Sequence, residues 1–152
     1  MSVRARAHEK ISGVGALAVS PKRRRLAFYL SLHKSKNIRT AILLRFLKHL
    51  RKHLAGAVVL LWDRGQVHKA KIIREYLSTL KNWEVAWLPP YAPELNPMEH
   101  GWAYMKYGCL ANFSPAVLQQ LHGGVVREYR KAARNPQLIK SFFRGSKLPF
   151  FD

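Results

Sequence analysis

The sequence is poor in cysteine, and it has no long apolar run. Its single cysteine, Cys109, excludes internal disulfides and zinc sites built from several cysteines. The longest uncharged apolar segment, Ala57 to Trp62, is far shorter than the roughly 20 residues of a membrane-spanning helix. The first ten residues lack the apolar segment of a secretory signal peptide. These absences fit a protein of the reducing cytoplasm that has no membrane partner.

Acidic residues are also scarce. There are 8 of them against 27 lysines and arginines, which gives a formal net charge of +19. Because 48% of the 152 residues are hydrophobic, we expect one folded domain with a packed core. A folded domain of this charge fits a polyanionic partner, with nucleic acid first and an anionic membrane second.

Hydrophobic spacing predicts alternating strands and helices. The first two expected strands flank the turn SPKRRR and form a hairpin, Asn37 is the expected cap of the first helix, and the continuous apolar run before Asp63 is typical of a strand buried on both faces. The order predicts an α/β sheet covered by helices, with parallel pairing in its middle part. We expect strands at residues 11–20, 26–32, 57–62 and 84–88, and helices at residues 37–54, 68–81, 96–110, 115–134 and from 136 onwards.

Asp63 is the first candidate for chemistry. It lies at the carboxyl end of an expected buried strand, which is the edge of an open α/β sheet where ligands bind. A carboxylate there can reach a metal ion while its backbone stays rigid. The alternative is that Asp63 only opens the turn DRGQ, since Asp and Gly are common in turns.

Glu99 is the second candidate, and it follows an unusual segment. Residues 88–102, LPPYAPELNPMEHGW, hold four of the eight prolines. Asn96 suits a helix N-cap and Pro97 the first helical position. Glu99 then falls third, where it can steady the helix as part of a capping box.

Considered together, the two acids favour catalysis. Right-handed connections can bring the two strand ends to one edge of the sheet, where the proline-rich loop returns Glu99 towards Asp63. Paired carboxylates bind Mg²⁺, and two such ions about 4 Å apart support phosphodiester cleavage. We therefore expect the carboxylates of Asp63 and Glu99 to lie about 4–8 Å apart.

The segments WDRGQVHKAKIIREYL and WLPPYAPELNPMEHGWAYMK resemble the DDE transposases of the mariner superfamily, in its bacterial insertion-sequence branch. The resemblance runs from about Ile11 to the C-terminus. It implies an RNase H-like α/β fold, a mixed sheet flanked by helices. It also implies two divalent metals, Mg²⁺ or Mn²⁺, bound by an Asp, a second Asp and a Glu. Asp63 matches the second Asp and Glu99 the Glu. His68 matches a position where the family usually has His; it could orient Asp63 or a phosphate, or pack at a helix start.

The sequence departs from the family pattern in two ways. Arg64 stands where the family commonly has Asn, and this cation could weaken metal binding or contact a phosphate. The family's first Asp lies on a central first strand before the hairpin, whereas the only acid before Asp63 is Glu9, in polar, strand-poor sequence. The family's helix-turn-helix region has no counterpart either. We therefore expect a single, N-terminally truncated catalytic domain whose sheet lacks its first central strand. Its segments are 1–10, poorly structured; 11–113, the RNase H-like core; and 114–152, the C-terminal helices.

Other residues have two interpretations each. Lys22, Arg23, Arg24 and Arg25 form the hairpin tip, which either contacts phosphates or is simply a solvated turn. The basic helix at 37–54 could lie on an anionic membrane, but its leucine face more simply covers the sheet. The tryptophans Trp62, Trp87 and Trp102 are expected in the core, since base stacking requires exposure.

These patterns favour a DNA transposase fragment whose parent enzyme cleaves and transfers DNA strands with Mg²⁺ or Mn²⁺. We expect the fragment to be inactive alone, to bind transposon ends and target DNA, and to belong to the bacterial cytoplasm and nucleoid. A homo-oligomer or an upstream transposase fragment could supply the missing strand. The alternative is a non-catalytic basic DNA-binding remnant or a regulator of transposition. A metal titration discriminates between the two.

Overall fold

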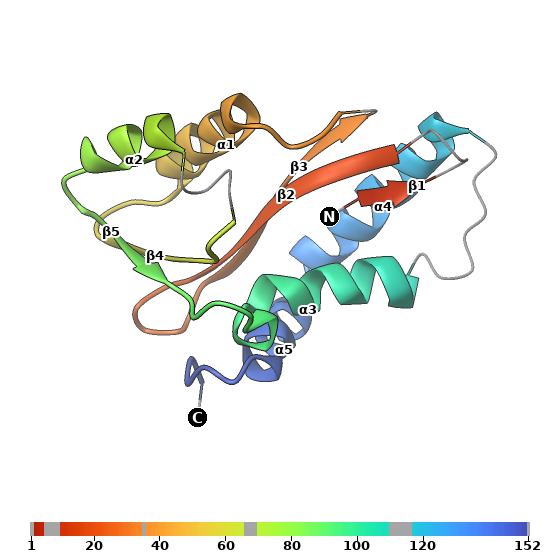
Figure 1. Ribbon diagram of the computed structural model, residues 1–152. Helices are drawn as coiled ribbons and strands as arrows, with labels where there is room; N and C mark the ends of the chain where they lie inside the picture. The colour runs from red at the N-terminus through yellow and green to blue at the C-terminus, as the bar shows by residue number, and fades with distance from the viewer. Residues whose placement is uncertain (1, 5–9, 35, 66–69, 110–116, 152) are drawn as a thin grey trace. The chain divides into compact units, whose positions relative to one another are not determined.

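The computed structural model describes residues 2–4, 10–34, 36–65, 70–109 and 117–151. Figure 1 traces them along the chain. They fall into two compact units. Unit 1 comprises Met1–Asn37 and Pro97–Asp152, and unit 2 comprises Ile38–Asn96. Each unit has a small sheet and its own helices. Within the described residues, no helix is long and apolar enough to span a bilayer.

The sheet of unit 1 is antiparallel, with the order β1-β2-β3. Strands β2 (Lys10–Val19) and β3 (Leu26–Lys34) form the predicted hairpin and run side by side in Figure 1. Strand β1 (Ser2–Arg4) lies in a segment predicted to be poorly structured, and that prediction is wrong for these three residues. They pair with Lys10–Ser12 of β2, because a strand edge offers backbone donors and acceptors that require partners.

Among the described residues, three α-helices and one π-helical segment complete unit 1. Helix α3 (Pro97–Ala103) continues into a π-helical segment, η3 (Tyr104–Cys109), where the sequence predicted one regular helix. Helix α4 (Leu118–Ala133) contacts β2 and β3, and α5 (Pro136–Gly145) contacts β3 and α3. The Asn135 side chain accepts a hydrogen bond from the Leu138 N–H at 3.1 Å. This cap, with proline at the first helical position, explains why α5 begins at the predicted Asn-Pro pair.

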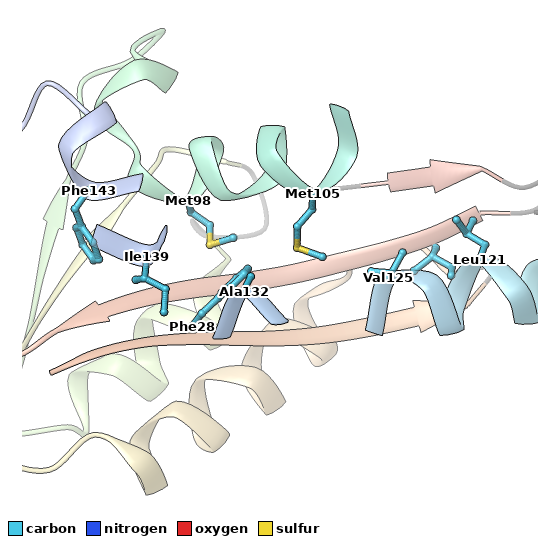
Figure 2. Close-up of a cluster of buried hydrophobic side chains, with 9 residues drawn as sticks. Phe28, Met98, Met105, Leu121, Val125, Ala132, Ile139 and Phe143 are labelled. Atoms are coloured by element: carbon cyan, nitrogen blue, oxygen red, sulfur yellow. The ribbon is translucent and has the colours of Figure 1, made fainter. Parts of the chain in front are cut away.

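The core of unit 1 lies between the hairpin and these helices (Figure 2). The Phe28 ring meets the Tyr129 ring edge-on, with centroids 5.1 Å apart. The Tyr129 hydroxyl donates a hydrogen bond to the Phe28 carbonyl oxygen at 2.7 Å. Burial raises the pKa of Tyr129 above its ordinary value. The buried members of the core are Ile11, Phe28, Met98, Met105, Leu121, Val125, Ala132, Ile139 and Phe143.

Glycines on β2 allow α3 to approach the sheet closely. A Cβ at Gly15 would lie 2.9 Å from the Cη2 atom of Trp102 and 3.1 Å from the Cε atom of Met98. Real Cβ atoms are essentially never found closer than 3.0 Å to such atoms, so a larger residue there must displace the indole.

We therefore expect Gly15→Ala to lower the free energy of unfolding by about 1–3 kcal/mol, the usual cost of overpacking a core. Urea unfolding followed by circular dichroism measures the change. The matched control is Gly123→Ala on α4, where an added Cβ meets nothing within 4 Å and alanine is the better helix former. Equal stabilities for the two variants would contradict the close packing of α3 on β2.

The sheet of unit 2 is a parallel pair. Strand β4 (Val58–Trp62) pairs with β5 (Trp83–Trp87), so that Trp62 is opposite Trp87. The Leu88 N–H extends the ladder by donating to the Trp62 carbonyl oxygen at 2.7 Å. This confirms the predicted parallel pairing. The other elements in the described part of unit 2 are α1 (Thr40–His53), α2 (Lys71–Ser78) and the short 3-10 helix η2 (Pro93–Leu95).

The apolar face predicted for the first helix is confirmed, but its start is not. Leu43, Leu47 and Leu50 are buried in α1. The helix begins at Thr40 with Arg39 at the cap position and no capping side chain. The Asn37 carboxamide oxygen instead accepts a hydrogen bond from the Lys10 ammonium group, so it is unavailable as the predicted cap.

Strand β4 also differs from its prediction. Its residues alternate between covered and open positions, and the Val59 and Leu61 side chains are 62% and 38% exposed. Burial on both faces is therefore wrong for β4. The sequence could not show this, because an apolar residue on an open sheet face looks the same in sequence as one in a core.

Candidate active site

Asp63 directly follows β4 and is half-buried. Its Oδ1 atom accepts a hydrogen bond from the Gly65 N–H at 2.9 Å, so Asp63 does open a turn, as the structural alternative predicted. A carboxylate has about four lone-pair positions, and this bond occupies one of them. The turn therefore fixes the direction of the Asp63 side chain, and it is compatible with Asp63 acting as a ligand to a cation.

Arg64 joins the ends of the two parallel strands. Its Nε–H donates to the Leu88 carbonyl oxygen at 3.4 Å, and the residue as a whole is exposed. Since a guanidinium carries five donors, several are left for another acceptor such as a phosphate. Asp63, Arg64 and Leu88 thus lie at one edge of unit 2, the carboxyl ends of β4 and β5.

Glu99 is the third residue of α3 and is exposed. No described residue bonds to its carboxylate. The predicted capping box would need this carboxylate to accept from the Asn96 N–H, but that group donates to the Pro93 carbonyl oxygen at 3.0 Å. The capping-box interpretation is therefore wrong, and the carboxylate remains available for a cation.

The pairing of the two acids stays a prediction, since Asp63 belongs to unit 2 and Glu99 to unit 1. His68, the possible orienting residue, and Glu9, the only acid before Asp63, lie outside the described residues. Among the residues that are described, no group of three or more His, Cys, Asp and Glu side chains comes together. Two carboxylates are nevertheless the oxygen donors that Mg²⁺ prefers, because it keeps several waters and takes few protein ligands.

Aromatic side chains mark the same edge of unit 2. The Trp62 and Trp87 rings stack with centroids 6.2 Å apart and planes 9° apart. Trp62 is buried as predicted, but Trp87 is 39% exposed, so its assignment to the core is wrong. Trp87 lies opposite Trp62, at the end of the parallel strand pair.

Sequence reasoning missed Tyr91, which is fully exposed and has a φ angle of +57°. For a residue other than glycine, this left-handed backbone costs roughly 1–2 kcal/mol. Tyr91 follows Pro90 in a turn, and a positive φ directly after such a proline normally calls for Gly or Asn. The signal in the sequence that could have identified Tyr91 was therefore an aromatic residue directly after Pro90, at a turn position that disfavours such residues.

The hairpin tip presents its four cations to solvent, but one of them has structural partners. The Arg23 Nε–H donates to the Phe150 carbonyl oxygen at 2.8 Å, and its backbone φ is +57°. The backbone N–H groups of Arg24 and Arg25 donate to the Ser20 hydroxyl at 3.2 and 3.0 Å. Within the described residues, the side chains of Lys22, Arg24 and Arg25 have no partner, so these three remain the candidates for phosphate contact.

Residues 2–122 match the family of DDE superfamily endonucleases, and the chain belongs to this family. No curated protein sequence matches it. The crystal structure of the Mos1 mariner transposase catalytic domain is similar, with a TM-score of 0.62 and 21% identity over 89% of this chain and 74% of that one. The structure of the same domain with raltegravir and Mg has a TM-score of 0.62 and 20% identity, over 89% of this chain and 75% of that one.

The Mos1 transposase in a paired-end complex with the left transposon end gives a TM-score of 0.63 and 20% identity, over 90% of this chain and 50% of that one. At these identities the likeness establishes the fold. It confirms the predicted RNase H-like α/β fold, since these neighbours are transposase catalytic domains of that kind. The DDE family is confirmed by its own match, while the bacterial insertion-sequence branch stays a prediction.

Proposed function

We propose that this chain is a DNA transposase domain in which Asp63 and Glu99 bind Mg²⁺ or Mn²⁺ for the cleavage and transfer of DNA strands. The observation that carries the proposal is the position of Asp63. It follows β4 at the carboxyl edge of a parallel strand pair, within a chain of the DDE endonuclease family. The structures of the Mos1 catalytic domain with Mg and with Mn support a divalent cofactor by likeness.

Each of the proposed site residues would have its own role at the carboxyl edge of the β4–β5 pair. Asp63 and Glu99 would supply carboxylate oxygens to the cations, which activate the attacking oxygen and stabilise the leaving one. The Gly65 N–H keeps the Asp63 carboxylate in place. The remaining donors of Arg64 would hold a phosphate of the bound strand.

The proposed DNA partners are transposon ends and target DNA, and the structure of the Mos1 transposase with the left transposon end supports the first of these by likeness. Lys22, Arg24 and Arg25 would contact phosphates without reading bases, together with Arg64. The resemblance of the motifs around Asp63 and Glu99 to the bacterial insertion-sequence branch supports a further proposal, that the chain belongs to a bacterial insertion sequence and acts in the cytoplasm at the nucleoid.

We also propose that residues 1–152 do not cleave DNA by themselves. The family pattern calls for a first Asp, and only Glu9 precedes Asp63 among the acids. The described part of unit 2 pairs β4 with β5 alone, which leaves a strand edge that another chain could extend. A second copy or an upstream transposase segment would then complete the site.

A second candidate is a non-catalytic DNA-binding regulator or remnant. Arg64 favours it, because a cation beside Asp63 opposes metal binding, and the net charge of +19 suffices for DNA binding.

Metal binding separates the two functions. Titrating Mn²⁺ or Mg²⁺ into the protein should give a dissociation constant in the micromolar to millimolar range. Asp63→Ala should abolish binding, because it removes the ligand at the strand end. Glu94→Ala is the matched control, since it removes an exposed acid outside the proposed site. Metal-independent DNA binding without any cation affinity would favour the regulator.

Plasmid nicking tests the proposed inactivity. We expect no nicking in Mg²⁺ or Mn²⁺, and nicking when an upstream segment carrying a strand and an Asp is added. Robust nicking by the chain alone, lost in Asp63→Asn or Glu99→Gln, would overturn this expectation and make Glu9 the next residue to replace.

A further inference from the structure

Tyr91 combines two costs that a folded chain normally avoids. The residue is 101% exposed, although tyrosine has an amphipathic side chain that usually buries its ring. Its φ of +57° is also a conformation that glycine adopts readily and tyrosine does not. Glycine at this position would relieve the strain and remove the exposed ring. Strain at such a position is characteristic of functional sites, and here the strained residue presents an aromatic ring to solvent.

The fold places this ring near Asp63. The Leu88 N–H bonds to the Trp62 carbonyl at 2.7 Å, which brings Leu88 beside the residue that precedes Asp63. Tyr91 follows Leu88 by three residues, so their Cα atoms are at most about 11 Å apart. Pro89 and Pro90 restrict the path between them. Tyr91 therefore belongs to the same strand-end edge of unit 2 as Asp63 and Arg64.

The chemistry of this edge fits a nucleic-acid strand. An exposed aromatic face stacks on any unpaired base, and Arg64 offers donors for the neighbouring phosphate. A fully paired duplex has no free base face to offer. The recognised feature would therefore be an unpaired nucleobase, of any sequence, close to the reacting end of the strand.

We propose that Tyr91 is a positioning residue whose ring stacks on an unpaired DNA base and so fixes the strand end beside Asp63. This inference rests on the proposed function, because it assumes that DNA lies at the Asp63 edge. It adds the preference for an unpaired base. In the competing outcome, the exposed ring binds a second copy of the chain instead of a DNA base.

The test uses the full chain in EDTA, so that it is independent of metal binding and cleavage. The probe is a short duplex with a single-stranded 3′ overhang that carries the fluorescent base aminopurine. The wild-type chain should quench the aminopurine by stacking. Tyr91→Phe should preserve both quenching and affinity. Tyr91→Ala should abolish the quenching and weaken overhang binding roughly 5- to 100-fold, with less than about twofold effect on the blunt duplex.

Tyr91→Gly separates stacking from strain. It should lose the quenching as Tyr91→Ala does, yet raise the thermal midpoint by about 2–4 °C, since glycine tolerates the positive φ. Wild-type quenching retained in Tyr91→Ala would overturn the inference while leaving the proposed function intact. The same holds if both variants only dissociate an oligomer in size-exclusion chromatography. If the wild-type chain binds neither probe, the proposed function fails, and the inference fails with it.

Discussion

The affinity of this chain for duplex DNA is expected to fall at least about a thousandfold as salt rises from about 50 to 200 mM. The net charge of +19 and the exposed hairpin tip imply many phosphate contacts. Each contact releases a condensed counterion and adds about 0.9 to the slope of log affinity against log salt concentration. Fluorescence anisotropy with a labelled duplex at several KCl concentrations measures this slope.

The hairpin tip should account for part of that slope. Replacing Lys22, Arg24 and Arg25 by alanine should lower its magnitude by up to about 3, one contact for each side chain. The matched control replaces Arg127, Arg130 and Lys131 on α4, where Glu128 already pairs with the first and third. An unchanged slope in the hairpin variant would remove the tip from the DNA surface, and an equal drop in both would indicate a diffuse surface.

Phe28→Ala is expected to lower the free energy of unfolding by about 3–5 kcal/mol, the usual loss for a buried aromatic ring. Phe28 is 3% exposed and packs against Tyr129, so its removal leaves a cavity between β3 and α4. Guanidinium unfolding followed by circular dichroism measures the change.

The control for Phe28→Ala is Tyr129→Phe, which keeps both rings and removes only the hydroxyl that bonds to the Phe28 carbonyl. It should cost about 1 kcal/mol. A similar small loss in Phe28→Ala would show that the hairpin and α4 do not share one core.

The elements that the sequence predicted best are those marked by periodicity or by turn chemistry. The hairpin, the parallel pair and the N-terminal cap of α5 follow from two strands flanking a turn, from the strand–helix–strand order and from Asn135 with Pro136. Each of these signals is local, so each can be recognised before any tertiary contact is known. The family motifs around Asp63 and Glu99 were informative for the same reason.

Two failures depended on neighbours that are distant in sequence. Asn37 bonds to Lys10 rather than capping α1, and Val59 faces solvent because its side of β4 is open. The capping box around Glu99 failed for a local reason instead, because the Asn96 N–H donates to the Pro93 carbonyl oxygen three residues earlier. Hydrophobicity alone could not distinguish the exposed ring of Trp87 from a buried ring such as that of Trp62, since both residues are tryptophans.

The bond between Arg23 and the Phe150 carbonyl has a practical consequence for how the protein is produced. It fastens the turn between β2 and β3 to the last residues of the chain. An affinity tag fused at the carboxyl terminus would begin beside the basic tip. Such a tag, and above all an acidic one, would compete with DNA for Lys22, Arg24 and Arg25. Weak DNA binding by a carboxyl-tagged preparation would then report on the tag, so the tag should be cleaved or moved to the amino terminus.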